Sequence, residues 1–211
     1  MTDTDSFFPK DAKKLRERIR RYERAFRAPH HDDGAGRRFL LGPLYLFSDD
    51  QDGALGAYAW YENAFPDDTP EAFNHLCWTL TLLRANRAEE AKRKLRELAF
   101  SNFYVVPAIL GHNPSPHPFR HFSNWNELSY ITEGPYAEYF SLWKPDELEW
   151  LGLQWAVPQL QCDITKFMEV QKRLEIAHSG PEREALIALS QVIERGLPEN
   201  VTNLDDHRKK E

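Results

Sequence analysis

Prolines divide the second half of the chain into segments of helical length. A proline is tolerated in the first turn of a helix, where its missing N–H would have no partner anyway, and Pro145, Pro158 and Pro181 each begin such a segment. No run of residues alternates apolar and polar side chains as a half-buried strand does. The sequence therefore predicts an all-α fold. The helices expected in this half cover residues 124–143, 145–156, 158–178 and 181–195.

Positive charge is concentrated near the N-terminus. Nine basic and three acidic side chains lie between Pro9 and Pro29, so this segment carries +6 while the rest of the 211-residue chain carries −12. The segment is predicted to form a basic amphipathic helix, because its apolar residues recur at helical spacing. We expect this apolar stripe to pack on the body of the protein; a membrane surface or a nucleic acid is the alternative target. The stripe consists of Leu15, Ile19, Tyr22 and Phe26.

The first half is expected to contain three further helices with short connections. Residues 53–65 and 70–85 predict an antiparallel pair, because Pro66 ends the first helix and Thr69 caps the second. Four prolines between Pro107 and Pro118 then predict an extended loop. The third helix is marked by Ala88, Ala91, Leu95 and Leu98.

An internal pattern runs through this half. Leucine-glycine, tyrosine, alanine, aromatic and proline follow one another at fixed spacing, and a second unit 37 residues later repeats part of the pattern with Ala91 and Leu95. The pattern resembles the tetratricopeptide repeat (TPR) over about residues 35–102. Arg38 stands in place of the family's tryptophan, and Pro43 interrupts the first expected helix. The first unit is carried by Leu41, Gly42, Tyr45, Ala54, Tyr58 and Pro66.

The resemblance implies TPR-like antiparallel helix pairs, completed by further helices into one compact domain. It also implies protein binding, since the concave face of such repeats commonly holds a peptide or a helix. The lysines, arginines and asparagines that form a carboxylate clamp on the first helix of each unit in some TPR proteins do not make up such a clamp here. The corresponding surface could bind an apolar partner helix, or the chain's own terminal segments, including the N-terminal stripe, could fill it. The surface is made of Phe73, Leu76, Leu80 and Leu83.

A histidine-rich loop suggests a different class of function. His112, His117 and His121 could converge on a transition metal, and Glu133 and Glu138 lie in a Tyr/Glu cluster at 130–139 that could supply acid/base groups. The alternative is therefore a metal-dependent or small-molecule enzyme. The usual phosphate-loop, nucleophile-elbow and zinc-helix motifs are missing from the sequence, so we expect no cofactor and favour a non-enzymatic role.

Cellular context is limited by what the sequence lacks. Cys77 and Cys162 are too few for a disulfide framework and fit a reducing compartment. The first residues are acidic where a secretory signal would be basic, and the longest nearly apolar run, at residues 39–47, is too short to span a bilayer. We expect a cytoplasmic protein with no membrane span.

Five parts and one function follow from these observations. The function expected is a protein–protein interaction or scaffold module, which binds a partner helix or peptide through the apolar TPR-like groove and the basic N-terminal helix. A homo-oligomer is left open, and nucleic acid is disfavoured because the −12 remainder repels phosphate. The parts are 1–34, the basic helix and linker; 35–106, the TPR-like pairs; 107–121, the Pro/His loop; 122–198, C-terminal helices packing on the pairs; and 199–211, a polar tail.

Overall fold

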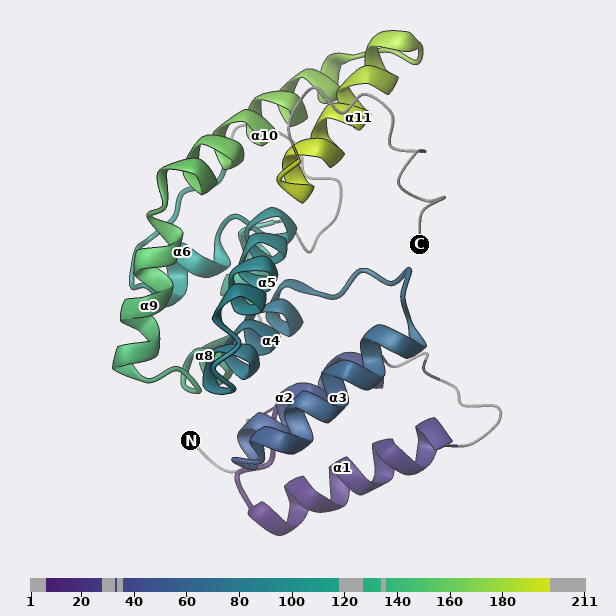
Figure 1. Ribbon diagram of the computed structural model, residues 1–211, viewed down its shortest axis with the longest axis vertical. Coiled ribbons are helices and arrows are strands. Elements are labelled where there is room, and N and C mark those ends of the chain that lie inside the picture. The colour runs from purple at the N-terminus through teal and green to yellow at the C-terminus, as the bar shows by residue number, and fades with distance from the viewer. Residues whose placement is uncertain (1–6, 28–32, 34–35, 118–126, 134–135, 198–211) are drawn as a thin grey trace.

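The computed structural model describes residues 7–27, 33, 36–117, 127–133 and 136–197. Within these ranges every regular element is a helix, so the all-α fold is confirmed. Figure 1 shows the helices stacked from α1 at one end to the α10–α11 pair at the other. The elements are α1 Ala12–Arg27, α2 Arg37–Phe47, α3 Gln51–Ala64, α4 Ala72–Arg84, α5 Ala88–Ser101, α6 Val105–Ile109, α7 Ser129–Thr132, α8 Tyr136–Phe140, α9 Pro145–Trp155, α10 Pro158–Ile176 and α11 Pro181–Arg195.

Three sequence expectations about helix boundaries were wrong. α4 begins at Ala72 with Glu71 at its N-cap, and not after a Thr69 cap. A short helix, α6, includes Pro107, which was expected to begin an extended loop. The single helix expected at 124–143 is replaced, in its described part, by α7 and α8, because Pro135 between them in the sequence cannot donate an N–H to a continuous helix.

The first helix pair, α2 and α3, packs closely because Gly42 has no side chain. A Cβ at this position would lie 2.7 Å from the Tyr58 hydroxyl oxygen, so the ring of Tyr58 occupies the space a side chain would need. Tyr58 in turn stacks on Trp78 of α4, with ring centroids 4.8 Å apart. Ala54 and Ala91, the two small residues of the internal pattern, are fully buried. The helices of 37–101 thus follow one another as two antiparallel pairs.

The helix α2 passes through Pro43 without a break, because α4 supplies the missing hydrogen bond. Proline cannot donate to the carbonyl four residues earlier, which belongs to Phe39. The side-chain amide of Asn74 in α4 donates to that carbonyl at 2.8 Å, in a buried position. One polar side chain of the second pair therefore satisfies a backbone group of the first.

The apolar stripe of α1 packs on the body, as expected from the sequence. Leu15, Ile19 and Tyr22 are buried where α1 lies against α2, and the half-buried Phe26 lies against Trp60 of α3, with ring centroids 4.5 Å apart. None of the described helices combines the length and the apolar character that crossing a bilayer would require.

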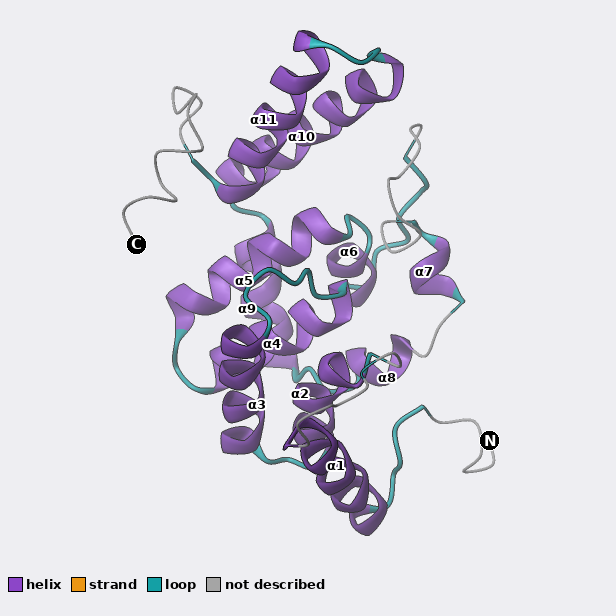
Figure 2. Cartoon of the chain, turned by 90° about the vertical axis from the view of Figure 1, so that its right-hand side faces the viewer, coloured by secondary structure: helices purple, strands orange, loops and turns teal. Residues whose placement is uncertain are grey.

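The apolar surface of α4 is covered by the middle of the chain. Phe73, Leu76 and Leu80 are buried and Leu83 is half-buried. Phe73 stacks on Tyr136 of α8, with ring centroids 4.0 Å apart. Figure 2 shows α6, α7 and α8 on one side of the stack. The expectation that the N-terminal stripe fills this surface is thereby corrected, since the stripe lies on α2 and α3 and α8 supplies the ring over Phe73.

The C-terminal pair α10–α11 packs on α5 around a second apolar cluster. This cluster joins Phe100 and Phe103 to residues such as Ile164 and Leu186. Arg96 of α5 holds the pair: its guanidinium lies 2.8 Å from the Asp163 carboxylate and donates to the Glu194 carbonyl at 2.9 Å. The pair is thus attached both by apolar burial and by one arginine.

We predict that Gly42→Ala destabilises the protein and that Gly56→Ala, in α3, stabilises it. Tyr58 is pinned by Trp78 and cannot move aside, so overpacking at position 42 costs about 1–3 kcal/mol, which exceeds the gain of about 1 kcal/mol in helix propensity. Nothing lies within 4 Å of a Cβ at position 56, so only the propensity gain remains there. Urea unfolding followed by circular dichroism measures both; equal effects of the two substitutions would contradict the close packing of α2 on α3.

We also predict energetic coupling between Asn74 and Pro43. Asn74→Ala leaves the buried Phe39 carbonyl unpaired and lowers the free energy of unfolding by about 1–3 kcal/mol. Pro43→Ala restores an N–H that can reach the same carbonyl, so Asn74→Ala should cost about 1 kcal/mol less in that background. A double-mutant cycle by urea unfolding measures the difference. Additive effects would show that the Asn74 amide does not replace the proline's missing donor.

Candidate docking site

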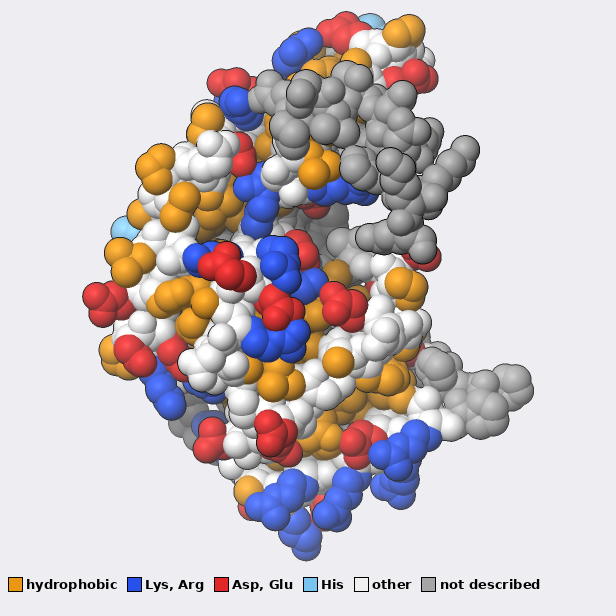
Figure 3. All heavy atoms as spheres, viewed as in Figure 1, with side chains coloured by type: hydrophobic (Ala, Val, Ile, Leu, Met, Phe, Trp, Pro, Cys, Tyr) orange, Lys and Arg blue, Asp and Glu red, His pale blue; other side chains and the backbone are white. Residues whose placement is uncertain are grey.

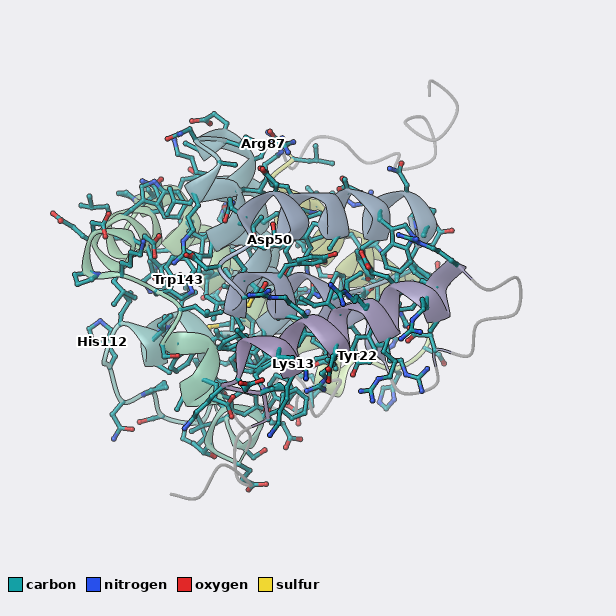
Figure 4. The ribbon with its side chains drawn as sticks, turned by 90° about the horizontal axis from the view of Figure 1, so that it is seen from below. Lys13, Tyr22, Asp50, Arg87, His112 and Trp143 are labelled. Atoms are coloured by element: carbon teal, nitrogen blue, oxygen red, sulfur yellow. The ribbon has the colours of Figure 1, made fainter. Side chains whose placement is uncertain are left out.

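The exposed side of α1 carries a row of cations, which we call the basic strip. α1 contains eight basic side chains and two acidic ones, Glu17 and Glu23. Figure 3 shows lysine and arginine side chains gathered along the lower edge of the molecule, over α1, and Figure 4 views this helix from below with Lys13 and Tyr22 labelled. The strip is made of the exposed residues Lys13, Lys14, Arg16, Arg20, Arg21, Arg24 and Arg27.

The basic strip differs from the charged surface of α5 in how its cations are paired. On α5, Arg87 pairs with Glu90 and Lys92 lies 2.7 Å from Glu89. Within the described ranges, no cation of the strip forms an ion pair with a carboxylate. Arg24 donates to the backbone carbonyl of Arg20, at 3.2 Å. The strip therefore keeps most of its positive charge available to an external group.

A groove runs beside the strip, between α1 and α3. It encloses about 260 Å³, and its walls are mostly apolar. Gly53 and Gly56 contribute no side chain to the α3 side, while Phe26 of α1 and Trp60 of α3 provide aromatic walls. The groove is lined by Glu23, Phe26, Arg27, Leu41, Tyr45, Gly53, Gly56, Ala57 and Trp60.

Two polar groups of the groove wall, those of Tyr45 and Glu23, are already bonded to each other. The Tyr45 hydroxyl donates to the Glu23 carboxylate at 2.6 Å. Burial, with the adjacent Glu23 carboxylate, raises the pKa of Tyr45 well above its ordinary value, so the phenol stays protonated at neutral pH. Its single proton is committed to Glu23. The groove therefore offers apolar surface and no uncommitted phenol donor.

Helical geometry places three strip arginines on the groove side of α1. At 3.6 residues per turn, Arg16, Arg20 and Arg27 project on the same side of the helix as Glu23, which lines the groove. The buried stripe is turned toward the body, and Lys14 and Arg21 lie on the far side. A molecule in the groove is thus next to a cationic edge.

The histidine loop does not form a metal centre in the part of the chain that is described. His112 is exposed, at the edge of the molecule in Figure 4. His117 stacks on Tyr104, with ring centroids 5.0 Å apart. His121 lies outside the described residues, so the three-histidine site stays a prediction. No group of three described histidine, cysteine, aspartate or glutamate residues could hold a metal ion.

The two glutamates suggested as acid/base groups do not line the groove between α1 and α3. Glu133 is exposed just after α7. The carboxylate of Glu138 in α8 accepts the backbone N–H groups of Phe7 and Phe8, at 2.7 and 3.0 Å. Glu138 therefore anchors the segment before α1. Phe8 stacks on Phe47 of α2, so this anchor belongs to the packing of the N-terminus.

Sequence reasoning found the helix and missed the groove. The stripe and the cations of α1 were identified from their spacing, whereas Trp60, Tyr45 and the two glycines were not expected to form a site. Gly53 and Gly56, three residues apart in an expected helix, were the available signal, because that spacing places a side-chain-free patch on one face.

The chain matches no protein-family model, no curated protein and no solved structure among those with which it was compared. The candidate site is therefore defined by the geometry of α1 and α3 alone.

Proposed function

We propose that the protein is a recognition module that binds an acidic segment of a partner protein along α1. The observation that carries the proposal is a row of cations without carboxylate partners in the described ranges, directly beside an apolar groove. Charge complementarity of this kind accelerates association and selects partners of opposite sign, and its effect weakens as salt is added.

The burial of the stripe argues against a bilayer as the partner. An amphipathic helix that lies in a membrane interface inserts its apolar side among the lipids. In α1 that side is occupied: Leu15, Ile19 and Tyr22 are each 6% exposed or less. Insertion would require α1 to leave the body and to uncover the apolar surface of α2.

The charge of the whole chain argues against a nucleic acid. A long polyanion near α1 also meets the rest of the molecule, whose sequence carries −12. A short acidic protein segment contacts the strip alone and escapes this repulsion. It can also contribute an apolar side chain, which suits the groove beside the strip.

We further propose that α2–α3 and α4–α5 are TPR-like pairs that serve as the scaffold for this site. The support is the close α2–α3 contact at Gly42 and the buried alanines at positions 54 and 91. α4 also contacts both helices of the first pair, as expected when one repeat stacks on the next. Because α8 covers Phe73, the docking surface in this proposal is α1 and not the apolar surface of α4.

The triple substitution Arg16→Gln, Arg20→Gln and Arg27→Gln tests the proposal. The probe is a fluorescein-labelled synthetic peptide of 16 residues, rich in glutamate, with one leucine near its centre. We expect the substitution to weaken binding about tenfold or more, measured by fluorescence anisotropy at low salt, and added salt to weaken binding to the unsubstituted protein.

The matched control removes the same charge elsewhere, by Lys92→Gln, Arg93→Gln and Lys172→Gln on exposed positions of α5 and α10. It should bind the peptide as the unsubstituted protein does. Equal weakening by both triple substitutions would reduce the effect to net charge and reject a site on α1. Tighter binding of a DNA duplex or of phosphatidylserine vesicles than of the peptide would reject a protein partner.

A further inference from the structure

We propose that the groove between α1 and α3 receives one leucine or phenylalanine side chain of the bound acidic segment. This inference rests on the proposed function, since the strip must hold the segment in place. It specifies the pocket, the side chain that enters it and the register of the segment along α1, none of which the charge of the strip determines.

The size of the groove fits one side chain. It encloses about 260 Å³. A cavity of about 150 Å³ can hold a benzene ring, whereas pockets for larger organic ligands run from about 300 to 1,000 Å³. The groove is therefore large enough for one aromatic ring or branched aliphatic group and smaller than the pockets of larger organic ligands.

The chemistry of the walls selects an apolar group. Phe26, Trp60 and Leu41 contribute rings and methyl groups to the lining, together with the methyl group of Ala57. The polar end is closed by the bond from Tyr45 to Glu23, at 2.6 Å. A carboxylate at this end would face Glu23 and be repelled, whereas the exposed Arg27, which also lines the groove, attracts carboxylates to its edge. The acidic groups of the segment must therefore stay outside, on the arginines, while an uncharged residue enters.

The positions of the arginines set the register of the segment. Arg20 and Arg27 are seven residues apart in α1, which corresponds to about 10.5 Å along the helix axis. Glu23 and Phe26, which line the groove, lie between them in the sequence. A helical segment beside α1 with acidic residues at positions i and i+7 can match both arginines. Its residue at i+3 or i+4 then lies over the groove.

Gly56 provides a way to close the groove without strain. It is exposed in the middle of α3, lines the groove, and a Cβ built on it meets nothing within 4 Å. A leucine at this position can lie in the groove and occupy the space proposed for the anchor. The matched control is Ala59→Leu, which adds an apolar side chain to an exposed position of the same helix outside the groove.

The experiment uses the full-length protein and three labelled peptides that differ only at the central residue. Each peptide has glutamate at positions i and i+7, and its residue i+4 is leucine, phenylalanine or alanine. Fluorescence anisotropy gives the dissociation constants. We expect the leucine or phenylalanine peptide to bind at least about tenfold more tightly than the alanine peptide. Gly56→Leu should remove that preference, and Ala59→Leu should preserve it.

Each outcome has a distinct meaning. Equal binding of the three peptides, with binding still lost in the triple arginine variant, would overturn the groove inference and leave the proposed function standing. Absence of binding by every peptide would overturn both. A preference for leucine that survives in Gly56→Leu would place the anchor outside the groove and would likewise overturn the inference.

Discussion

The position of α2 between its two neighbours is the constraint on which the rest of the structure depends. On one side the missing side chain of Gly42 admits the ring of Tyr58, and on the other Asn74 bonds the carbonyl that Pro43 leaves without a donor. Both contacts require α2 to sit at short range from α3 and α4. Once α2 is fixed, the stripe of α1 has a surface to lie on. The groove exists because α1 then meets α3 at Phe26 and Trp60.

Much of the helical architecture could be predicted from local signals. Pro145, Pro158 and Pro181 begin the last three helices, and the spacing of Leu15, Ile19 and Tyr22 identified the buried side of α1. Asp50 also caps α3, by accepting the N–H of Gly53, three residues later, at 2.8 Å. These features depend on neighbours within a few residues, so the sequence contains the information needed to predict them.

The errors and omissions concern contacts between distant parts of the chain. Nothing near Phe73 in sequence indicates that Tyr136, 63 positions later, will stack on it. In the same way, Trp60 and Glu23 come from different helices, and neither stands out in its own segment. The groove between them is a product of helix packing, where residue types that are ordinary along the chain become a site only through their proximity in space.

The attachment of α10–α11 has a consequence for the open end of the stack. The helix at the end of a stack has one face without a neighbouring helix. If that face is apolar and exposed, it promotes association with other chains. Phe100 of α5 and Phe103, just after this helix, would form such a surface, and the C-terminal pair shields them. Arg96 holds the pair in place through Asp163 and the end of α11. The pair therefore covers this surface, and it lies at the opposite end of the stack from α1 (Figure 1). The covered apolar surface and the proposed docking helix thus lie at opposite ends of one row of helices.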